Sequence, residues 1–345
     1  MIAIIMAGGS GTRFWPMSNE KHPKQFLKLF DNKSMIQLTY ERVLSFIKPD
    51  DIYIVTTLKQ VELILEHIPE INKSQLIIEP CGMNTAPCIA LAICFLMKKY
   101  PETTPCLVLP ADHYIPDTVA FSKAMTFALE SCSDINSQNL VTFGIVPTYP
   151  ATGYGYIEAS VEISPSMFHV KHFKEKPELK IAEEFLQKGN YFWNSGMFCW
   201  TLKTIFNSYL EHESSIIDVI NKLPTNSEPE SQLLLYKAIK KVPIDIAILE
   251  KSKNVIVIPL NFIWSDVGSW FSLSELFLKD RHSNYLKKSG YVKESEGNFV
   301  ISEKIVALIG VQDLVVVATE DALLIMDKSR AEEVKYIGEN IARKL

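Results

Sequence analysis

The sequence predicts an α/β fold with a mainly parallel central sheet and a small β-rich arm at the C-terminal end. Two observations support this prediction. Short apolar runs alternate with helical patterns through the first half of the chain, which is typical of βαβ units whose helices cover both faces of a sheet. After about residue 285, closely spaced β-like runs replace this alternation, so a separate small unit is expected there.

The first half supplies most strands of the expected sheet, and each is a short aliphatic run. The strands are residues 2–6, 52–56, 76–78, 106–109 and 140–145, with helical patterns at residues 86–99 and 120–132. In sheets of this kind a ligand binds beyond the carboxyl ends of the strands. A glycine-rich turn follows the first run, Glu79 follows the third, and Asp112 follows the fourth. The candidate site is therefore expected at this edge.

The second half is less regular. Strands are expected at residues 154–158, 170–175 and 255–259, helices after Pro177 and around residues 205–223, and an exposed loop at residues 226–231. The arm offers β-like runs at residues 299–302, 305–309, 314–319 and 322–326, followed by a closing helix at residues 329–343. These changes predict a main domain over residues 1–284 and the arm over residues 285–345.

Composition and charge narrow the class of protein. Apolar residues make up 47% and charged residues 22%, which is ordinary for a globular protein. Lys and Arg number 35 against 40 Asp and Glu, so nothing indicates a nucleic-acid or membrane-surface partner. The six cysteines form no CxxC pair, as expected of free thiols in a cytoplasmic protein. The apolar N-terminus is too short for a signal peptide, and no run is long enough for a transmembrane helix.

A glycine-rich turn with two cations nearby is the first candidate ligand site. The turn comprises Gly8, Gly9, Ser10, Gly11, Thr12 and Arg13. Backbone N–H groups in such a turn suit anionic oxygens, and Arg13 and Lys24 add charge for phosphate groups. No Gly-Lys-Ser/Thr sequence closes the turn, and Phe14 stands where a dinucleotide-binding turn has its third glycine. A tight turn without a ligand is the alternative interpretation.

Several blocks of the sequence resemble the sugar-nucleotide pyrophosphorylase family. The first is Met-Ala-Gly-Gly-Ser-Gly-Thr-Arg-Phe-Trp-Pro at residues 6–16, followed by Pro-Lys-Gln-Phe at residues 23–26. Further blocks resemble its mannose-1-phosphate guanylyltransferases, in the same order: residues 79–87, 109–113, 153–157, 173–177, 193–198 and 264–270. The resemblance covers nearly the whole chain. It implies a Rossmann-like nucleotidyltransferase domain that transfers GMP from GTP to α-D-mannose 1-phosphate, giving GDP-mannose and pyrophosphate, with Mg²⁺ as cofactor.

The resemblance and the chemistry together indicate four catalytic candidates. Such a transfer needs positioning and positive charge more than a covalent nucleophile. Arg13 offers a planar fork for β- and γ-phosphate oxygens, and the resemblance places Lys24 near the reacting phosphates. Asp112 and Asp266 each follow an apolar run and are the candidate Mg²⁺ ligands, because two carboxylates can be joined by waters and phosphates in its shell. A turn or helix cap is the alternative role for either aspartate.

The resemblance also implies which residues bind the two substrates. The nucleotide is expected along residues 8–13 and, around the base, at Glu79, Gly82, Asn84 and Thr85. The sugar phosphate is expected at Gly153, Tyr154, Glu175, Lys176 and Asn194. A β-bulge at the glycines and a salt-bridged turn at residues 175–177 are the structural alternatives.

Two departures from the family pattern leave the exact substrate open. Met83 and Asn19 stand where the family usually has arginine, which removes positive charge near the expected polyanion site. One alternative is therefore a pyrophosphorylase for another sugar 1-phosphate or NTP, and another is a catalytically silent sugar-nucleotide-binding regulator. The arm is expected to join two chains in a homodimer. Longer relatives carry an isomerase domain that this chain does not reach, so no isomerase activity is expected.

Overall fold

The computed structural model describes residues 1–9, 11–133, 138–223 and 229–341. Internal contacts group the chain into two compact units. The larger unit comprises Met1–Gly8, Gln37–Ala111 and Ile115–Trp264. The smaller unit comprises Gly9–Ile36, Asp112–Tyr114 and Ser265–Leu345, so it draws on both ends of the sequence.

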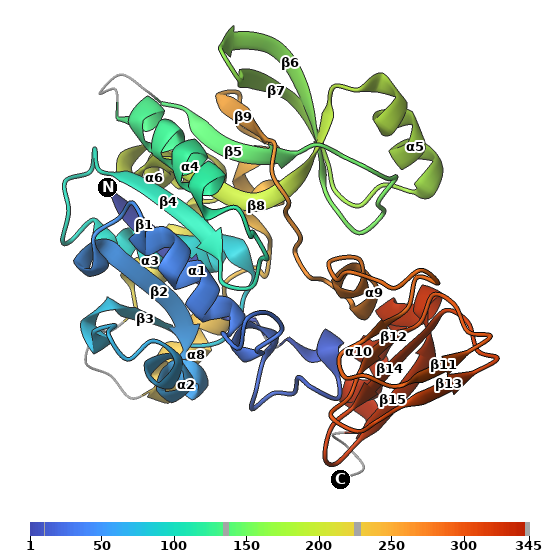
Figure 1. The fold of residues 1–345 in the computed structure, drawn as a ribbon. Helices are drawn as coiled ribbons and strands as arrows, with labels where there is room; N and C mark the ends of the chain where they lie inside the picture. Colours follow the sequence, from blue (N-terminus) through green and yellow to red (C-terminus); the bar gives the residue numbers. More distant parts are fainter. Residues whose placement is uncertain (10, 134–137, 224–228, 342–345) are drawn as a thin grey trace. The chain divides into compact units, whose positions relative to one another are not determined.

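A nine-stranded sheet forms the centre of the larger unit, in the order β3-β2-β1-β4-β8-β5-β9-β7-β6 (Figure 1). Its strands are β1 (Ile2–Met6), β2 (Ile52–Thr57), β3 (Leu76–Glu79), β4 (Pro105–Pro110), β5 (Leu140–Ile145), β6 (Tyr156–Ser164), β7 (Met167–Lys174), β8 (Tyr191–Thr201) and β9 (Val255–Leu260). Strands β1 to β4 pair in parallel, as do β5 and β9, whereas β8 runs antiparallel between β4 and β5. The predicted α/β fold is confirmed.

Burial on both faces explains why the central strands are so apolar. Residues 2–5 of β1 are fully buried, and Ile4 pairs with Tyr53 of β2 and Val108 of β4. The same register pairs Met6 with Pro110, so the chain leaves β1 and β4 at one edge of the sheet. The sequence positions that follow these two strands are the glycine-rich turn and Asp112.

Helices cover the two faces of this sheet. They are α1 (Met35–Leu44), α2 (Val61–His67), α3 (Thr85–Leu96), α4 (Thr118–Cys132), α5 (Leu179–Lys188), α6 (Leu202–His212), α7 (Ser214–Asn221) and α8 (Pro229–Lys237). One core cluster gathers α3, α6 and α7 on one face, while α4 packs on β4 and β8 from the other (Figure 1). Among the described residues, no helix has the length and apolar character needed to span a membrane.

Two expectations for the second half need correction. The helical stretch predicted around residues 205–223 is two helices, because the backbone of Glu213 between α6 and α7 departs from helical geometry, with φ −151° and ψ 48°. Residues 226–228 of the predicted loop lie outside the described part of the chain, and residues 229–231 belong to a helix. Helix α8 begins at Pro229, whose fixed φ suits the first position of a helix.

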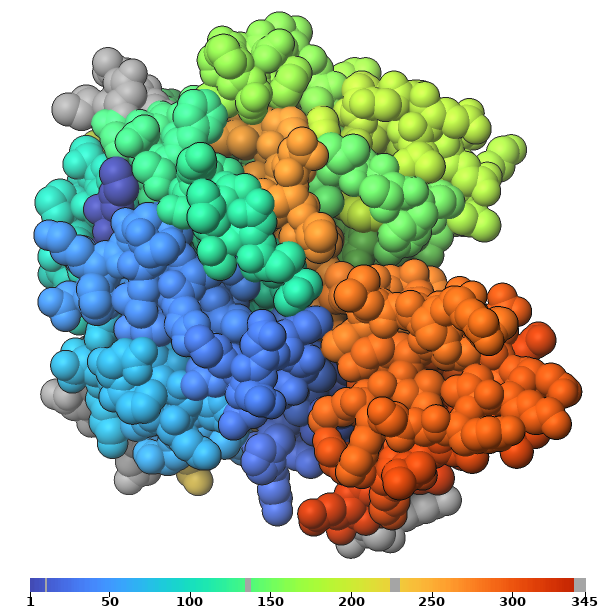
Figure 2. All heavy atoms as spheres, viewed as in Figure 1, coloured from blue at the N-terminus to red at the C-terminus, as the bar shows by residue number. Residues whose placement is uncertain are grey.

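The C-terminal part of the smaller unit, orange to red in Figure 2, is built from short strands. They are β10 (Tyr285–Leu286), β11 (Tyr291–Lys293), β12 (Phe299–Ile301), β13 (Ala307–Ile309), β14 (Leu314–Ala318) and β15 (Leu323–Asp327). Parallel pairing links β10, β12 and β14 in one sheet and β11 with β13 in another, around a small core of Val300, Leu308 and Val316. The four predicted arm strands are confirmed, and the short β10 and β11 are additional.

The closing helix begins later than the sequence indicates. Residues Lys328–Glu333 form 3₁₀ turns, and helix α10 spans Val334–Ile341. The last two residues of the predicted helix lie outside the described part of the chain. Helix α10 lies beside the 3₁₀ turn Thr12–Phe14 that carries Arg13.

Aromatic side chains hold the segments of the smaller unit together. The ring of Phe30 stacks on Tyr114 with centroids 3.9 Å apart and on Phe277 at 5.5 Å. Phe277 in turn lies 5.6 Å from Phe299 of β12. We call these four residues the aromatic column. It joins the N-terminal segment to the arm, so residues Gly9–Ile36 and Asp112–Tyr114 belong to the same compact unit as the arm. The domain boundary at residues 284/285 stays a prediction.

Candidate active site

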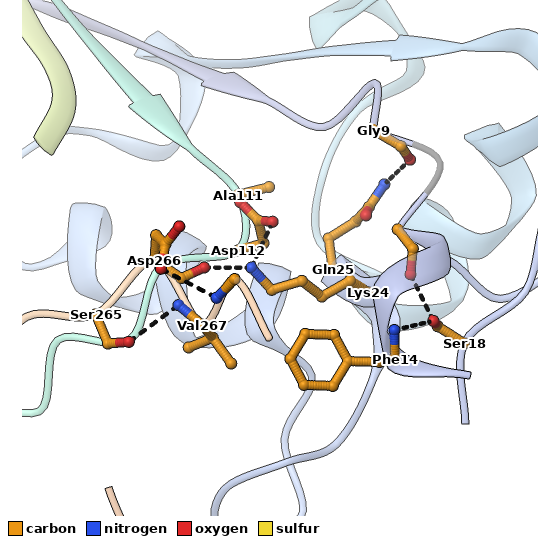
Figure 3. A network of polar contacts seen from close by, with 12 residues as sticks. Gly9, Phe14, Ser18, Lys24, Gln25, Ala111, Asp112, Ser265, Asp266 and Val267 are labelled. Atoms are coloured by element: carbon orange, nitrogen blue, oxygen red, sulfur yellow. Dashed lines mark hydrogen bonds and ion pairs between the residues drawn. The ribbon is translucent and has the colours of Figure 1, made fainter. Parts of the chain in front are cut away.

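Three predicted catalytic residues meet in the smaller unit (Figure 3). The Lys24 Nζ lies 2.8 Å from Asp112 Oδ2 and also donates a hydrogen bond to the backbone carbonyl of Asp266. The Lys24 side chain is 8% exposed and that of Asp112 is 34% exposed. The structure therefore brings together residues up to 242 positions apart in the sequence.

The glycine-rich turn positions Lys24. Gly11 has φ +58°, and a Cβ atom there would overlap the backbone nitrogen of Lys24. Only glycine meets both requirements without strain. The side-chain amide of Gln25 donates to the carbonyl oxygen of Gly9 at 3.1 Å, so the segment after Pro23 is tied back to the turn.

A hydroxyl closes the same turn from its other side. The Ser18 Oγ donates to the carbonyl of Gly11 at 2.5 Å and accepts the backbone N–H of Phe14 at 3.1 Å. The Phe14 ring packs edge-on against Trp270 of α9 (Trp270–Ser274), with centroids 4.9 Å apart. Arg13, between these anchors, is exposed. Thr12 lies in the same 3₁₀ turn, and Ser10 lies outside the described residues.

Asp266 lies in a strained turn. Ser265 and Tyr114 exchange two backbone hydrogen bonds of 2.9 and 3.1 Å, which bring Asp266 close to the Asp112 segment. Val267 has φ +45°, a conformation that costs a β-branched residue about 1–3 kcal/mol. The Ser265 Oγ accepts the N–H of Val267 at 3.0 Å, and Asp266 Oδ1 accepts the N–H of Gly268 at 3.0 Å. These bonds hold the strained turn.

These residues surround a cavity of about 260 Å³. Its lining comprises Gly11, Thr12, Arg13, Lys24, Asp112, His113, Asp266, Val267 and Gly268. Burial raises the pKa of Asp112, but the charges of Lys24 and His113 and the hydrogen bond from Lys24 outweigh it, leaving this pKa below its usual value. Asp112 is therefore ionised at neutral pH.

The donor set fits a magnesium ion that also binds substrate oxygens. Two carboxylates, of Asp112 and Asp266, line the cavity, and oxygen is the ligand that Mg²⁺ prefers. Within the described residues, no group of three or more His, Cys, Asp or Glu side chains could hold a metal. An ion at this place would therefore take its remaining ligands from waters and phosphates.

The expected base-binding loop lies in the larger unit and is held by Glu79. This carboxylate is 2% exposed, and its Oε1 accepts hydrogen bonds of 3.1 Å from the N–H of Met83 and from the hydroxyl of Tyr236. Burial raises the pKa of Glu79, and the two hydrogen bonds partly oppose this. Glu79 thus fixes the loop, with Oε2 near Gly8, where an added Cβ would come within 3.1 Å.

The other residues of this loop differ in exposure. Gly82 and Asn84 are exposed, and the Asn84 side chain caps α3 by accepting the N–H of Thr85 at 2.8 Å. Thr85 is half-buried, and its hydroxyl accepts the N–H of Ile244 at 2.8 Å. Met83 packs its side chain on the apolar core. The methionine found where arginine is usual is thus an apolar anchor of the loop.

Two of the expected sugar residues, Glu175 and Asn194, meet at Gly155 of the larger unit. A Cβ atom on Gly155 would come within 2.7 Å of Glu175 Oε2, and the carbonyl of Gly155 accepts the N–H of Asn194 at 2.8 Å. Lys176 pairs with Glu175 at 2.9 Å. Tyr154 packs its ring 5.0 Å from that of Trp193. Gly153 is exposed.

Sequence reasoning missed two polar residues beside these loops. Tyr236 on α8 bonds Glu79, and Asp245 accepts the side-chain amide of Asn194 at 2.7 Å. Each is 51 or more positions from its partner, and neither stands in a recognisable motif. The fold alone reveals them.

Comparisons with known proteins agree over the whole chain. The profile of the nucleotidyl transferase family matches residues 2–283, and that of the MannoseP isomerase/GMP-like beta-helix domain matches residues 292–340. A mannose-1-phosphate guanylyltransferase of Escherichia coli is 36% identical over 99% of this chain and 75% of its own length. One of Salmonella muenchen is 38% identical over 98% of this chain and 72% of its own length.

Two solved structures extend the comparison. A protein of Thermus thermophilus, described as a mannose-1-phosphate geranyltransferase, matches with a TM-score of 0.89 and 31% identity over 99% of both chains. A mannose-6-phosphate isomerase of Helicobacter pylori matches with a TM-score of 0.62 and 29% identity, covering 76% of this chain and 98% of its own.

Proposed function

We propose that this chain transfers GMP from GTP to α-D-mannose 1-phosphate. The premise is that it belongs to the nucleotidyl transferase family and, within that family, to the mannose-1-phosphate guanylyltransferases. Membership makes the chain a nucleotidyltransferase of GDP-mannose synthesis. The proposal adds the choice of GTP and a requirement for Mg²⁺. The main support for the proposal is the cluster of Lys24, Asp112 and Asp266, because these three residues offer the charges that such a transfer needs.

Each charged residue of the cluster has a role in the proposed reaction. An oxygen of the sugar phosphate attacks the α-phosphorus of GTP, the α–β bridging P–O bond breaks, and pyrophosphate leaves with the bonding electrons. Negative charge grows on that bridging oxygen, so preorganised cations favour the transition state. Lys24 offers a fixed ammonium, and the Arg13 fork suits two phosphate oxygens. A bound Mg²⁺, held by Asp112 and Asp266, would supply further charge stabilisation.

The remaining candidates are proposed to bind the two substrates. The backbone of Gly8, Gly9, Gly11 and Thr12 suits phosphate oxygens. Gly82 and Asn84 are accessible for the base, whereas Glu79 and Thr85 shape the loop that carries them. The sugar phosphate is assigned to Gly153, Tyr154, Glu175, Lys176 and Asn194.

A pyrophosphate-release assay tests the function directly. The four common ribonucleoside triphosphates would be combined with several hexose 1-phosphates, with and without a chelator. We expect GTP with mannose 1-phosphate to be the fastest pair and the activity to vanish on chelation. If another pair reacted faster, that pair would replace GTP and mannose 1-phosphate as the proposed substrates. If no pair were turned over, the alternative of a catalytically silent sugar-nucleotide-binding regulator would be favoured. Mannose 6-phosphate isomerisation would be assayed in parallel.

Replacing Arg13 by lysine is expected to raise the KM for GTP at least about 10-fold. Lysine keeps the charge but loses the fork that holds two phosphate oxygens at once. Because Arg13 is exposed, the melting temperature should stay unchanged. The exposed Arg281, changed to lysine, is the matched control and should keep wild-type kinetics. Unaltered kinetics in the Arg13 variant would reduce this residue to a surface cation.

We also propose that the arm joins two chains. Ile305, Ile309, Leu323 and Ile325 are between 56% and 79% exposed. They border a groove of about 800 Å³ along β13, β14 and β15. So small a unit cannot cover these side chains itself, and a two-fold pair is the commonest closed assembly. A second copy of this face would cover them.

Light scattering is expected to give twice the chain mass of 39.1 kDa at micromolar concentration. Changing Ile309 and Ile325 to aspartate together should yield monomers, because the two charges would be buried without partners. Leu278, which is 96% exposed and outside the groove, is the matched control as Leu278→Asp. A wild-type monomer, or a dimer that survives the double change, would contradict the proposal.

We also propose that the protein is cytoplasmic, and the cysteines support this location. All six are free thiols, and five of them are buried. Burial raises the pKa of Cys94 to about 11, and burial together with the charge of Glu79 raises the pKa of Cys81. Such thiols stay protonated and unreactive at neutral pH. A reducing compartment suits this composition.

A further inference from the structure

Asp245 occupies an unusual backbone position in the larger unit. It begins the π-helical turn Asp245–Leu249, a rare structure that is frequent at functional sites. The last three residues of this turn are buried in the core, whereas Asp245 itself is half-buried. The core thus fixes the backbone of the turn that carries the Asp245 carboxylate.

The carboxylate of Asp245 determines how Asn194 is oriented. Its Oδ1 accepts the Asn194 side-chain N–H at 2.7 Å. On the other end of the same amide, Asn194 Oδ1 accepts the N–H of Gly196 at 3.2 Å. The backbone N–H of Asn194 donates to Gly155, beside Glu175. Asp245 therefore belongs to the same group of side chains as the candidate sugar residues.

The segment before Asp245 is anchored to the start of α3. The N–H of Ile244 donates to Thr85 Oγ1 at 2.8 Å, and the N–H of Ala86 donates to the carbonyl of Val242 at 3.2 Å. These bonds fix the position of Asp245 from the side of the candidate base loop. Its place between Thr85 and Asn194 is thus set by two independent sets of hydrogen bonds.

The charges around Asp245 favour a hydroxyl as its ligand. The charges that act most strongly on Asp245 are those of Glu175 and Glu250, both acidic, and Glu175 is itself paired with Lys176 at 2.9 Å. Burial raises the pKa of Asp245 to about 6; the hydrogen bond from Asn194 opposes this, and the charge of Glu175 adds to it. Carboxylates whose charges act on one another disfavour a phosphate group beside them but accept O–H donors.

We propose that Asp245 recognises the sugar: one oxygen orients the Asn194 amide, and the other accepts a hydrogen bond from one hydroxyl of the hexose. The inference rests on the proposed function, because it takes a hexose 1-phosphate to bind at Glu175 and Asn194. It adds a specificity-determining residue that lies outside every block of the sequence resemblance.

Kinetics on a panel of substrates test this assignment. The full chain and its Asp245→Asn variant would be assayed with mannose 1-phosphate and with its 2-, 3-, 4- and 6-deoxy analogues. A hydrogen bond to a charged acceptor predicts that the wild type loses about 10- to 100-fold in kcat/KM on one analogue. The variant should show a similar loss on mannose 1-phosphate, mainly in KM, and no further loss on that analogue. Its KM for GTP should be unchanged.

A matched charge control and a pH profile separate recognition from a structural role. Glu250→Gln removes a charge that also acts on Asp245 and should retain the wild-type preference. Because Asp245 is ionised above about pH 6, the advantage of the wild type over Asp245→Asn should be full above pH 7 and fade as the pH falls below 6. A purely structural role would instead lower activity equally on every analogue and at every pH.

The outcomes for the two proposals differ. If the wild type turns over no sugar 1-phosphate, the proposed function fails, and calorimetric titration of mannose 1-phosphate into both proteins then decides the role of Asp245. If the wild type is active and Asp245→Asn keeps its KM for mannose 1-phosphate, only the Asp245 assignment is overturned. Equal losses on all analogues would also overturn it.

Discussion

Replacing Asp112 by asparagine is expected to lower kcat at least about 100-fold, the scale of losing one transition-state stabiliser. The change keeps the size of the side chain but removes a charge that the fold maintains by holding the pKa of Asp112 low. Lys24 would retain the carbonyl of Asp266 as an acceptor, so the variant should still fold. Turnover measured against magnesium concentration, with circular dichroism for folding, provides the test.

The same substitution at Asp266 should act in the same direction. Its carboxylate lines the cavity with Asp112, whereas Asp321 is exposed and lies outside it. Asp321→Asn is therefore the matched control and should leave kcat unchanged. Wild-type turnover by either active-site variant at saturating magnesium would show that its carboxylate serves only the turn.

Changing Gly11 to alanine is expected to cost about 100-fold in kcat/KM. The new methyl group would overlap the backbone of Lys24, so the segment carrying that ammonium must shift. A misplacement of about 1 Å at a reacting centre costs on the order of 100-fold. Steady-state kinetics with GTP and mannose 1-phosphate, alongside thermal unfolding, would measure the effect.

Gly310 provides a closely matched control for this change. Its φ of +66° is nearly that of Gly11 at +58°, yet a Cβ atom there would meet nothing within 4 Å. Gly310→Ala therefore carries the same backbone strain, about 1 kcal/mol of stability, without the overlap. Similar kinetic losses in both variants would mean that strain, and not the position of Lys24, limits the rate.

The strands that were predicted most accurately from the sequence are those whose burial restricts them to apolar residues. The runs at residues 2–6 and 140–145 match β1 and β5 because strands covered on both faces must be aliphatic. Strand β8 was not predicted, although it is the longest. It mixes aromatic residues with Asn194 and Gly196, because it runs antiparallel through the sheet and also carries polar groups of the candidate site.

The candidate site was predicted only in part. Motif resemblance pointed to Lys24, Asp112 and Asp266, but no local pattern places an ammonium 2.8 Å from a carboxylate 88 positions away. The place of Glu79 beside the base stays a prediction, and its burial and its bond to Tyr236 show in addition a carboxylate that holds the loop. Contacts of this kind depend on the tertiary fold, which a single sequence does not display.

Contacts between the two ends of the chain, the aromatic column among them, determine when the glycine-rich turn can be anchored during synthesis. Ribosomes make the chain from its N-terminus, so the glycine-rich turn emerges early. The indole N–H that donates to Trp15 belongs to Trp270, 255 residues later, and Phe277 comes after that. At 5–20 residues per second this delay is roughly 10–50 s. Strand β9 of the sheet ends at Leu260, before Trp270 is made, so the sheet can be complete before the glycine-rich turn is anchored. We therefore expect unfinished molecules to consume no nucleotide.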